Sequence, residues 1–166
     1  RERVGCVHAR CAAKRVARVL IEQQKKRWEE SRALHQRQEA TAYLLRGAIA
    51  ATEAGRIKSS VDGGRKNREA LDYFLKAHAL DPDDLDALIY IGHQHRALGD
   101  VQNALRTYRE VKERAAGPGD DKARLSFMAK RHEGEMLYKL ANGSVARLNA
   151  ARVVLQQSET AIPSEL

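Results

Sequence analysis

Apolar residues recur at helical spacing along most of this chain, and short polar breaks separate the runs. The clearest stretch covers residues 67–115, where two apolar patterns flank a proline turn and a third follows a Leu-Gly-Asp break. Spacings of three and four residues place apolar side chains on one face of a helix. No stretch alternates Val, Ile and Thr with polar residues, as a half-buried strand does. The pattern predicts an all-α fold.

One set of positions in this stretch occurs twice, with every member of the second set displaced from the first by the same interval. Each set contains, in order, a small residue, an aromatic residue, a second apolar residue and a helix-ending residue: Ala70, Phe74, Ala77 and Pro82, then Ala104, Tyr108, Val111 and Ala116. The period of about 34 residues is typical of stacked helix–turn–helix units. Gly92 and Ala104 predict where the two helices of the central unit approach most closely, because larger side chains would push them apart.

Turn residues mark the ends of the predicted central helices. Gly99 can take the left-handed conformation that ends a helix, and Asp100 can cap the helix that follows. Asp81 and Pro82 end the helix before, since Pro cannot continue it. A central helix pair is therefore expected over residues 85–118.

A preceding unit is predicted over residues 40–84, with residues 40–55 as its first helix and Gly47 in the place of Gly92. The interval from Gly47 to Ala70 is nearly twice the interval from Gly92 to Ala104. The additional residues fall at 56–66, whose Gly, Ser and charged residues predict an exposed loop.

A following unit is predicted over residues 127–160, after a break rich in Gly and Asp. Gly134 takes the glycine position, and Ala146, Ala150 and Val153 fit the second helix. The interval from Gly134 to Ala146 equals the interval from glycine to alanine in the central unit, which predicts an unchanged register.

These positions resemble the tetratricopeptide repeat (TPR) family. The central unit carries the resemblance at eight places: Leu88, Ile91, Gly92, His95, Gly99, Ala104, Tyr108 and Val111. His95 stands where an aromatic is usual, and Ala116 where Pro is usual. The resemblance covers about residues 40–160 and implies antiparallel helix pairs stacked as a short right-handed superhelix. It also implies a non-catalytic module that binds another protein.

In that arrangement the first helices line a concave groove. Helical spacing places ten residues of the first helices on this inner side as the expected partner-binding surface: Leu44, Asp86, Ile89, His93, Arg96, Met128, Arg131, Glu135, Tyr138 and Lys139. Such a surface suits an amphipathic helix or an extended peptide with an apolar anchor.

Residues 1–39 form a basic segment expected to be a long N-terminal helix, mainly over residues 4–38. It holds eleven Lys or Arg and five Glu, so most of the chain's net charge of +8 lies here. The segment is either a solvated helix face with internal ion pairs or a surface for nucleic acid, an anionic membrane or an acidic partner. Self-association through this helix is a further alternative. Trp28, which stands among charged residues, is expected to cover a neighbouring helix.

The remaining residue patterns carry no catalytic or cofactor chemistry. Cys6 and Cys11 lie five residues apart, which on a helix prevents a disulfide and fits no common zinc motif. His93 and His95 point to different faces of one helix, which argues against a joint metal site. The Gly63-Gly64 pair lacks the Lys and Ser or Thr of a phosphate-binding loop. No cofactor, no metal and no enzymatic activity are predicted.

Compartment and chain context are weakly defined by the sequence. No apolar stretch approaches the length of a membrane span. The chain begins with Arg1, which favours a fragment or a processed product, with residues 161–166 as a tail. The cytoplasm is the favoured compartment.

Overall fold

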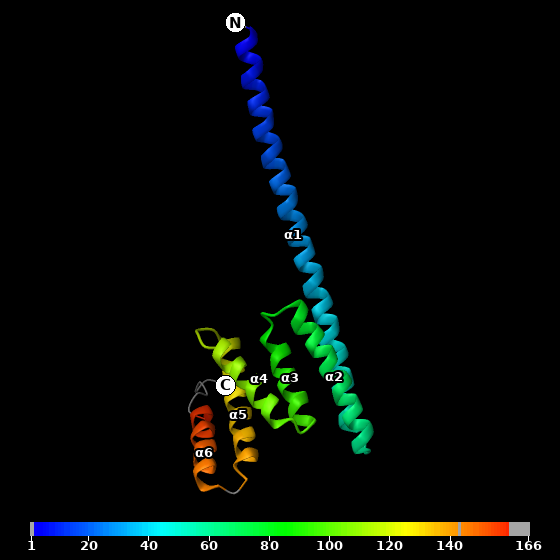
Figure 1. Cartoon of the computed structure of the whole chain (residues 1–166), viewed down its shortest axis with the longest axis vertical. Helices are drawn as coiled ribbons and strands as arrows, with labels where there is room; N and C mark the ends of the chain where they lie inside the picture. Colours follow the sequence, from blue (N-terminus) through cyan, green and yellow to red (C-terminus); the bar gives the residue numbers. More distant parts are fainter. Residues whose placement is uncertain (1, 143, 160–166) are drawn as a thin grey trace. The chain divides into compact units, whose positions relative to one another are not determined.

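Six helices make up the structure, a computed structural model that describes residues 2–142 and 144–159, with side chains at residues 14–142 and 144–158 (Figure 1). In chain order these helices are α1 (Glu2–Arg56), α2 (Ser60–Leu80), α3 (Leu85–Ala97), α4 (Val101–Arg114), α5 (Asp120–Ala141) and α6 (Val145–Glu159). No strand occurs in the described residues, so the all-α prediction is confirmed. Among the described residues, no helix has a stretch long and apolar enough to span a bilayer. The side chains of Cys6 and Cys11 and the predicted tail lie outside the described residues.

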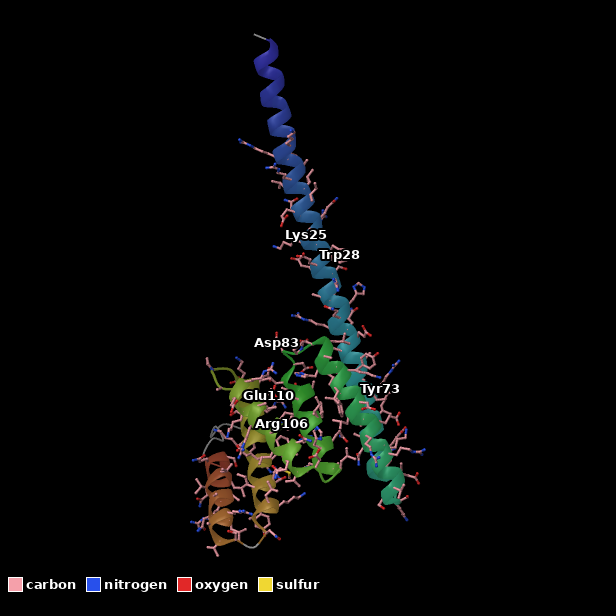
Figure 2. All side chains as sticks on the ribbon, viewed as in Figure 1. Lys25, Trp28, Tyr73, Asp83, Arg106 and Glu110 are labelled. Carbon is pink, nitrogen blue, oxygen red and sulfur yellow. The ribbon has the colours of Figure 1, made fainter. Side chains whose placement is uncertain are left out.

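The chain divides into two compact units, residues 1–38 and residues 39–166. The first unit is part of α1, and every side chain described in it, from residue 14 to residue 38, is exposed. Trp28 is 62% exposed, and the guanidinium of Arg32 lies 5.5 Å from its ring centroid. Figure 2 labels Trp28 and Lys25 on this segment. The predicted N-terminal helix and the predicted helix 40–55 are one continuous helix, since α1 runs unbroken to Arg56.

The second unit contains three pairs of consecutive helices, formed by residues 39–56 of α1 with α2, by α3 with α4, and by α5 with α6. Within each pair the connection has the same length, namely residues 57–59, 98–100 and 142–144. Neighbouring pairs also pack on each other, α2 against α3 and α4 against α5 (Figure 1). The two repeated sets occupy equivalent buried positions, since Ala70, Phe74, Ala77, Ala104, Tyr108 and Val111 are all at most 1% exposed.

A glycine on the first helix of each pair faces a large side chain on the second. A Cβ at Gly47 would lie 2.6 Å from the Phe74 ring, and a Cβ at Gly92 would lie 2.6 Å from the Tyr108 ring. Both rings are almost fully buried, so the space above each glycine is filled by aromatic carbon. Gly92 therefore marks the closest approach predicted for the central pair, and burial of each ring contributes roughly 1.5–3 kcal/mol.

The predicted exposed loop at residues 56–66 is mostly helix, and that prediction was wrong. Only residues 57–59 connect the helices, because α2 already begins at Ser60. The hydroxyl of Ser59 accepts a hydrogen bond from the backbone N–H of Asp62 at 3.3 Å and caps this helix. Lys66 is ion-paired to Glu53 of α1 at 2.9 Å. The additional residues therefore lengthen both helices of the first pair, since Arg56 lies nine residues after Gly47 whereas Ala97 lies five after Gly92.

The third pair departs from the predicted register. Ala146, Ala150 and Val153 are exposed, whereas Ala151 is 0% exposed and a Cβ at Gly134 would lie 2.5 Å from Cγ of Leu155. The interval from the glycine to the buried alanine is thus five positions longer than in the central pair. The physical reason is the length of the helices: α5 ends seven residues after its glycine and α3 ends five after. The buried alanine likewise lies six residues into α6, against three into α4.

Acidic side chains cap both central helices, and the Asp100 cap of α4 was predicted from the sequence. The carboxylate of Asp100 accepts from the backbone N–H of Asn103 at 3.2 Å and caps α4. Gly99 has φ of +78°, the left-handed conformation that needs a residue without Cβ. Asp84 caps α3 by accepting from the backbone N–H of Asp86 at 2.9 Å. Such caps satisfy backbone donors that have no partner within the helix.

Candidate functional site

Polar contacts join α3 to α5 along one side of the second unit. Asp86 pairs with Arg124 at 3.2 Å, Nε2 of His93 lies 3.1 Å from Nε2 of His132, and Arg96 donates to Glu135 at 2.8 Å. The contacting residues are spaced seven and three apart on α3 and eight and three apart on α5, so each set lies on one helix face. We call this surface the α3–α5 face and define it by these six residues together with Met128, Arg131, Tyr138 and Lys139.

The two histidines at the middle of the α3–α5 face are packed among aromatic rings. The ring of His132 stacks on Tyr108 with centroids 5.1 Å apart, and the ring of His93 meets it edge-on at 4.8 Å. Tyr90 contacts His93 at 6.2 Å and stacks on Phe74 at 5.1 Å, which links the histidines to the core of the first pair. Both imidazoles are therefore held in place by contacts from α3, α4 and α5.

Hydrogen bonds define the protonation of this cluster. The carboxylate of Glu135 can only accept, and it lies 3.2 Å from Nδ1 of His132. That contact requires a proton on Nδ1, which leaves a lone pair on Nε2 of neutral His132, facing His93. Arg96 also lies 3.3 Å from Nδ1 of His132, but it makes its shorter contact with Glu135.

Burial sets the titration behaviour of these groups. Burial, together with the neighbouring charges of His132 and Arg96, lowers the pKa of His93 to about 4. Burial also lowers the pKa of His132, against the opposing effect of Glu135. Burial raises the pKa of Glu135, but its hydrogen bond to His132 and the charge of Arg96 outweigh burial and hold the pKa below its ordinary value. Both histidines are therefore neutral at neutral pH.

The ten residues predicted to line a groove separate into two groups. Ile89 is 2% exposed and belongs to the core, so the expectation that it lies on an open surface was wrong. Leu44 and Met128 are half-buried and pack against that same core. The reason is that α5 covers this part of α3, while helical spacing alone does not say how closely the neighbouring helix approaches.

The other predicted groove residues lie on the surface or at its edge. Asp86, His93, Arg96 and Glu135 are half-buried in the contacts between α3 and α5, and Arg131 pairs with Glu135 at 3.5 Å. Tyr138 is 63% exposed, and Lys139 is also exposed. The outer half of the α3–α5 face is thus open and carries an aromatic ring and cations.

Sequence reasoning missed the partners that complete this face. His132 and Arg124 were not among the predicted groove residues, although both contact predicted ones. His132 follows its partner His93 by 39 residues, and Arg124 follows Asp86 by 38. Both separations exceed the repeat period of about 34 residues, so the period did not predict these two contacts. A second missed feature is Glu133, which is 3% exposed and ion-paired to Arg109 at 2.8 Å and Lys112 at 2.6 Å. Burial raises the pKa of Glu133, but these two cations outweigh burial and lower it.

Among the described residues, no group of three or more His, Cys, Asp or Glu side chains is arranged to hold a metal ion. The hydroxyl of Tyr108 is buried and has no hydrogen-bond partner among the described groups. Burial raises its pKa well above the ordinary value, so the group is a phenol and no base. No family model, no curated protein and no solved structure matches the chain. Its function has to be inferred from its own side chains.

Proposed function

We propose that this chain is a non-catalytic protein-interaction module of the TPR type, whose helix pairs stack as a short right-handed superhelix. The α3–α5 face is the proposed binding surface for a peptide or helix of another protein. The observation that carries the proposal is the equivalent burial of the two repeated sets, each with a glycine beneath its aromatic ring. A repeated packing unit of this size serves mainly to build an extended surface.

The contact between α3 and α5 supports the stacking part of the proposal. These are the first helices of successive pairs, and they touch directly although α4 lies between them in the chain. First helices that lie side by side form one continuous face, on which a ligand can contact two pairs at once.

The side chains of the α3–α5 face support the binding part. Tyr138 offers a mostly exposed ring, and Arg131, which is 62% exposed, lies two turns earlier on the same side of α5. Aromatic and Arg side chains are the residues most enriched at the energetic centres of protein interfaces. The ion pair between Arg131 and Glu135 orients the Arg131 side chain before binding, which reduces the entropic cost of association.

Site-specific photocrosslinking tests this proposal in cells. A photoreactive phenylalanine at position 138 is expected to crosslink a partner protein. The same group at position 106, where Arg106 is exposed on α4 (Figure 2), is expected to give no crosslink to that partner. With the partner purified, Arg131→Ala and Tyr138→Ala should each weaken binding by roughly tenfold or more, and Arg106→Ala should leave it unchanged. Equal crosslinking from both positions would refute a specific α3–α5 face.

The exposed basic helix favours a second candidate function, binding to nucleic acid or an anionic membrane. Residues 14–38 hold eight Lys or Arg against three Glu, and every side chain among them is exposed. Affinity for RNA, DNA or anionic vesicles would then fall steeply as salt is raised. Deletion of residues 1–38 should abolish that affinity, and a truncated chain that binds equally well would exclude this function.

A further inference from the structure

We propose that His93 and His132 form a two-imidazole binding site for a transition-metal ion, of which Zn²⁺ and Cu²⁺ are the expected occupants. The site goes beyond the protein-binding function and does not depend on it. Its basis is the approach of two Nε2 atoms from different helices to 3.1 Å, at the edge of the α3–α5 face.

The separation of the two nitrogen atoms fits a shared metal ion. Zinc binds imidazole nitrogen at about 2.0–2.1 Å, so an ion equidistant from atoms 3.1 Å apart subtends an N–metal–N angle of roughly 100°. This angle lies between those of square-planar and tetrahedral coordination, the geometries that Cu²⁺ and Zn²⁺ prefer. The rings meet edge-on, with an interplanar angle of 83°, which avoids stacking of one ring on the other.

The surroundings of His132 match what metal-binding histidines require. A histidine that binds through Nε2 usually donates its Nδ1–H to a carboxylate, which fixes the tautomer and raises the basicity of the ligand. Glu135 provides this carboxylate at 3.2 Å from Nδ1, and Arg96 holds Glu135 in turn at 2.8 Å.

The rings are also held in position without an ion. Tyr108 stacks on His132, and the ring centroids of Tyr108 and Tyr90 lie 6.0 Å and 6.2 Å from that of His93. A metal would therefore bind without moving either ring, once the proton on Nε2 of His93, which the contact with the Nε2 lone pair of His132 requires, has shifted to Nδ1 of His93. Since the described residues supply two protein ligands, water or a side chain of a bound partner takes the remaining positions.

The sequence explains why this site is distinct from the one considered earlier. His93 and His95 are two residues apart on α3 and face different sides, with Nδ1 of His95 3.3 Å from the carboxylate of Asp100. His95 is therefore the matched control, since it is a histidine of the same helix with a carboxylate partner and no second imidazole.

Calorimetric titration of the 166-residue chain with Zn²⁺ tests the proposal. The Cys6→Ser, His8→Gln and Cys11→Ser substitutions remove other ligand types near the N-terminus and serve as the common background. One equivalent of Zn²⁺ is expected to bind, and His93→Gln and His132→Gln are each expected to weaken binding by at least about tenfold. His95→Gln should bind as the background chain does. Equal affinity in all three variants, or no saturable binding, would overturn the site.

Nitrogen NMR of the background chain, with all its other histidines retained, keeps the test valid if a histidine variant fails to fold. Zn²⁺ should shift the Nε2 resonances of His93 and His132 together and leave those of His78 and His95 in place. Shifts at another histidine, or at only one of the pair, would equally contradict the proposal.

Discussion

The contact between Gly92 and Tyr108 leads to the most direct stability prediction. A Cβ at position 92 would lie 2.6 Å from Cε1 of Tyr108 and 3.0 Å from Cδ1 and Cζ. Favourable carbon contacts begin near about 3.5 Å, so either the ring or a helix has to move by roughly 0.9 Å. The ring is 0% exposed and stacks on His132, which leaves it little room to move.

Two opposing contributions determine the size of the effect of Gly92→Ala. Ala is a better helix former than Gly by about 0.8–1 kcal/mol, which favours the variant. Overpacking of a tight core costs about 1–3 kcal/mol, which opposes it. Because the contact is as short as 2.6 Å and the ring is fully buried, the overpacking cost should lie in the upper part of that range, at about 2–3 kcal/mol. The free energy of unfolding should therefore fall by roughly 1–2 kcal/mol, which for a chain of 166 residues corresponds to a decrease in Tm of about 2–8 °C.

Chemical denaturation monitored by circular dichroism measures this change, and two other glycines calibrate it. Gly55 lies in the last turns of α1, and a Cβ there would meet nothing within 4 Å, so Gly55→Ala should be neutral or stabilising. Gly134 faces Leu155, a half-buried and flexible side chain that can rotate away, so Gly134→Ala should cost less than Gly92→Ala. If Gly92→Ala were as stable as the parent chain, the close packing of the central pair would be refuted.

Three further predictions concern titration, capping and buried charge. The pKa of His93 is about 4 in the fold and about 6.5 in the unfolded chain, so the unfolded chain binds more protons between these two pH values. The free energy of unfolding should therefore fall, on the order of 1–2 kcal/mol, as pH decreases through this window. Denaturation of His93→Gln should show a shallower pH dependence. Asp84→Ala removes the α3 cap and should cost about 1 kcal/mol in urea denaturation, whereas Asp83→Ala, at a fully exposed side chain, should cost about a tenth of that or less. Glu133→Ala should lower the free energy of unfolding by about 2 kcal/mol, because it removes two ion pairs and leaves a void. Glu133→Met keeps the side-chain volume, so its free energy of unfolding in the same assay should lie within about 1 kcal/mol of the parent value.

The part of the fold that could be predicted is the part determined by local spacing. The all-α class, the boundaries near Pro82 and Gly99, and the buried set from Ala70 to Val111 follow from apolar periodicity and turn residues. These signals come from residues close together along the chain, so the sequence displays them directly. The central helix pair was therefore predictable almost residue by residue.

The wrong predictions concern the first and third helix pairs, which contain more residues than the central pair. Gly63 and Gly64 suggested a loop, but Gly63 is buried, and a Cβ added there would already lie 3.5 Å from the Ala54 carbonyl oxygen, so only a small residue packs against α1 at this point. In the third pair, the matching interval from Gly134 to Ala146 was coincidental, because Ala151 is the buried alanine. In both pairs the additional residues extend the helices, which adds backbone hydrogen bonds, and the connection keeps its length.

The candidate site was only partly predictable because its contacts depend on how neighbouring pairs pack. His93, Arg96 and Glu135 could be placed on helix faces from spacing alone. The approach of His132 to His93 could not be predicted from spacing, because it depends on how α5 packs against α3, and the whole of α4 lies between these helices in the chain.

Proton NMR of the glycine Hα resonances would test the central claim, that close-packed helix pairs repeat along the second unit. Protons above an aromatic ring resonate upfield, so Gly47 over Phe74 and Gly92 over Tyr108 should both show upfield Hα shifts and nuclear Overhauser contacts to those rings. Gly134, which faces Leu155, should show contacts to its methyl groups and an ordinary shift. Ordinary shifts at Gly47 and Gly92, without ring contacts, would contradict the proposed packing and the interaction surface built on it.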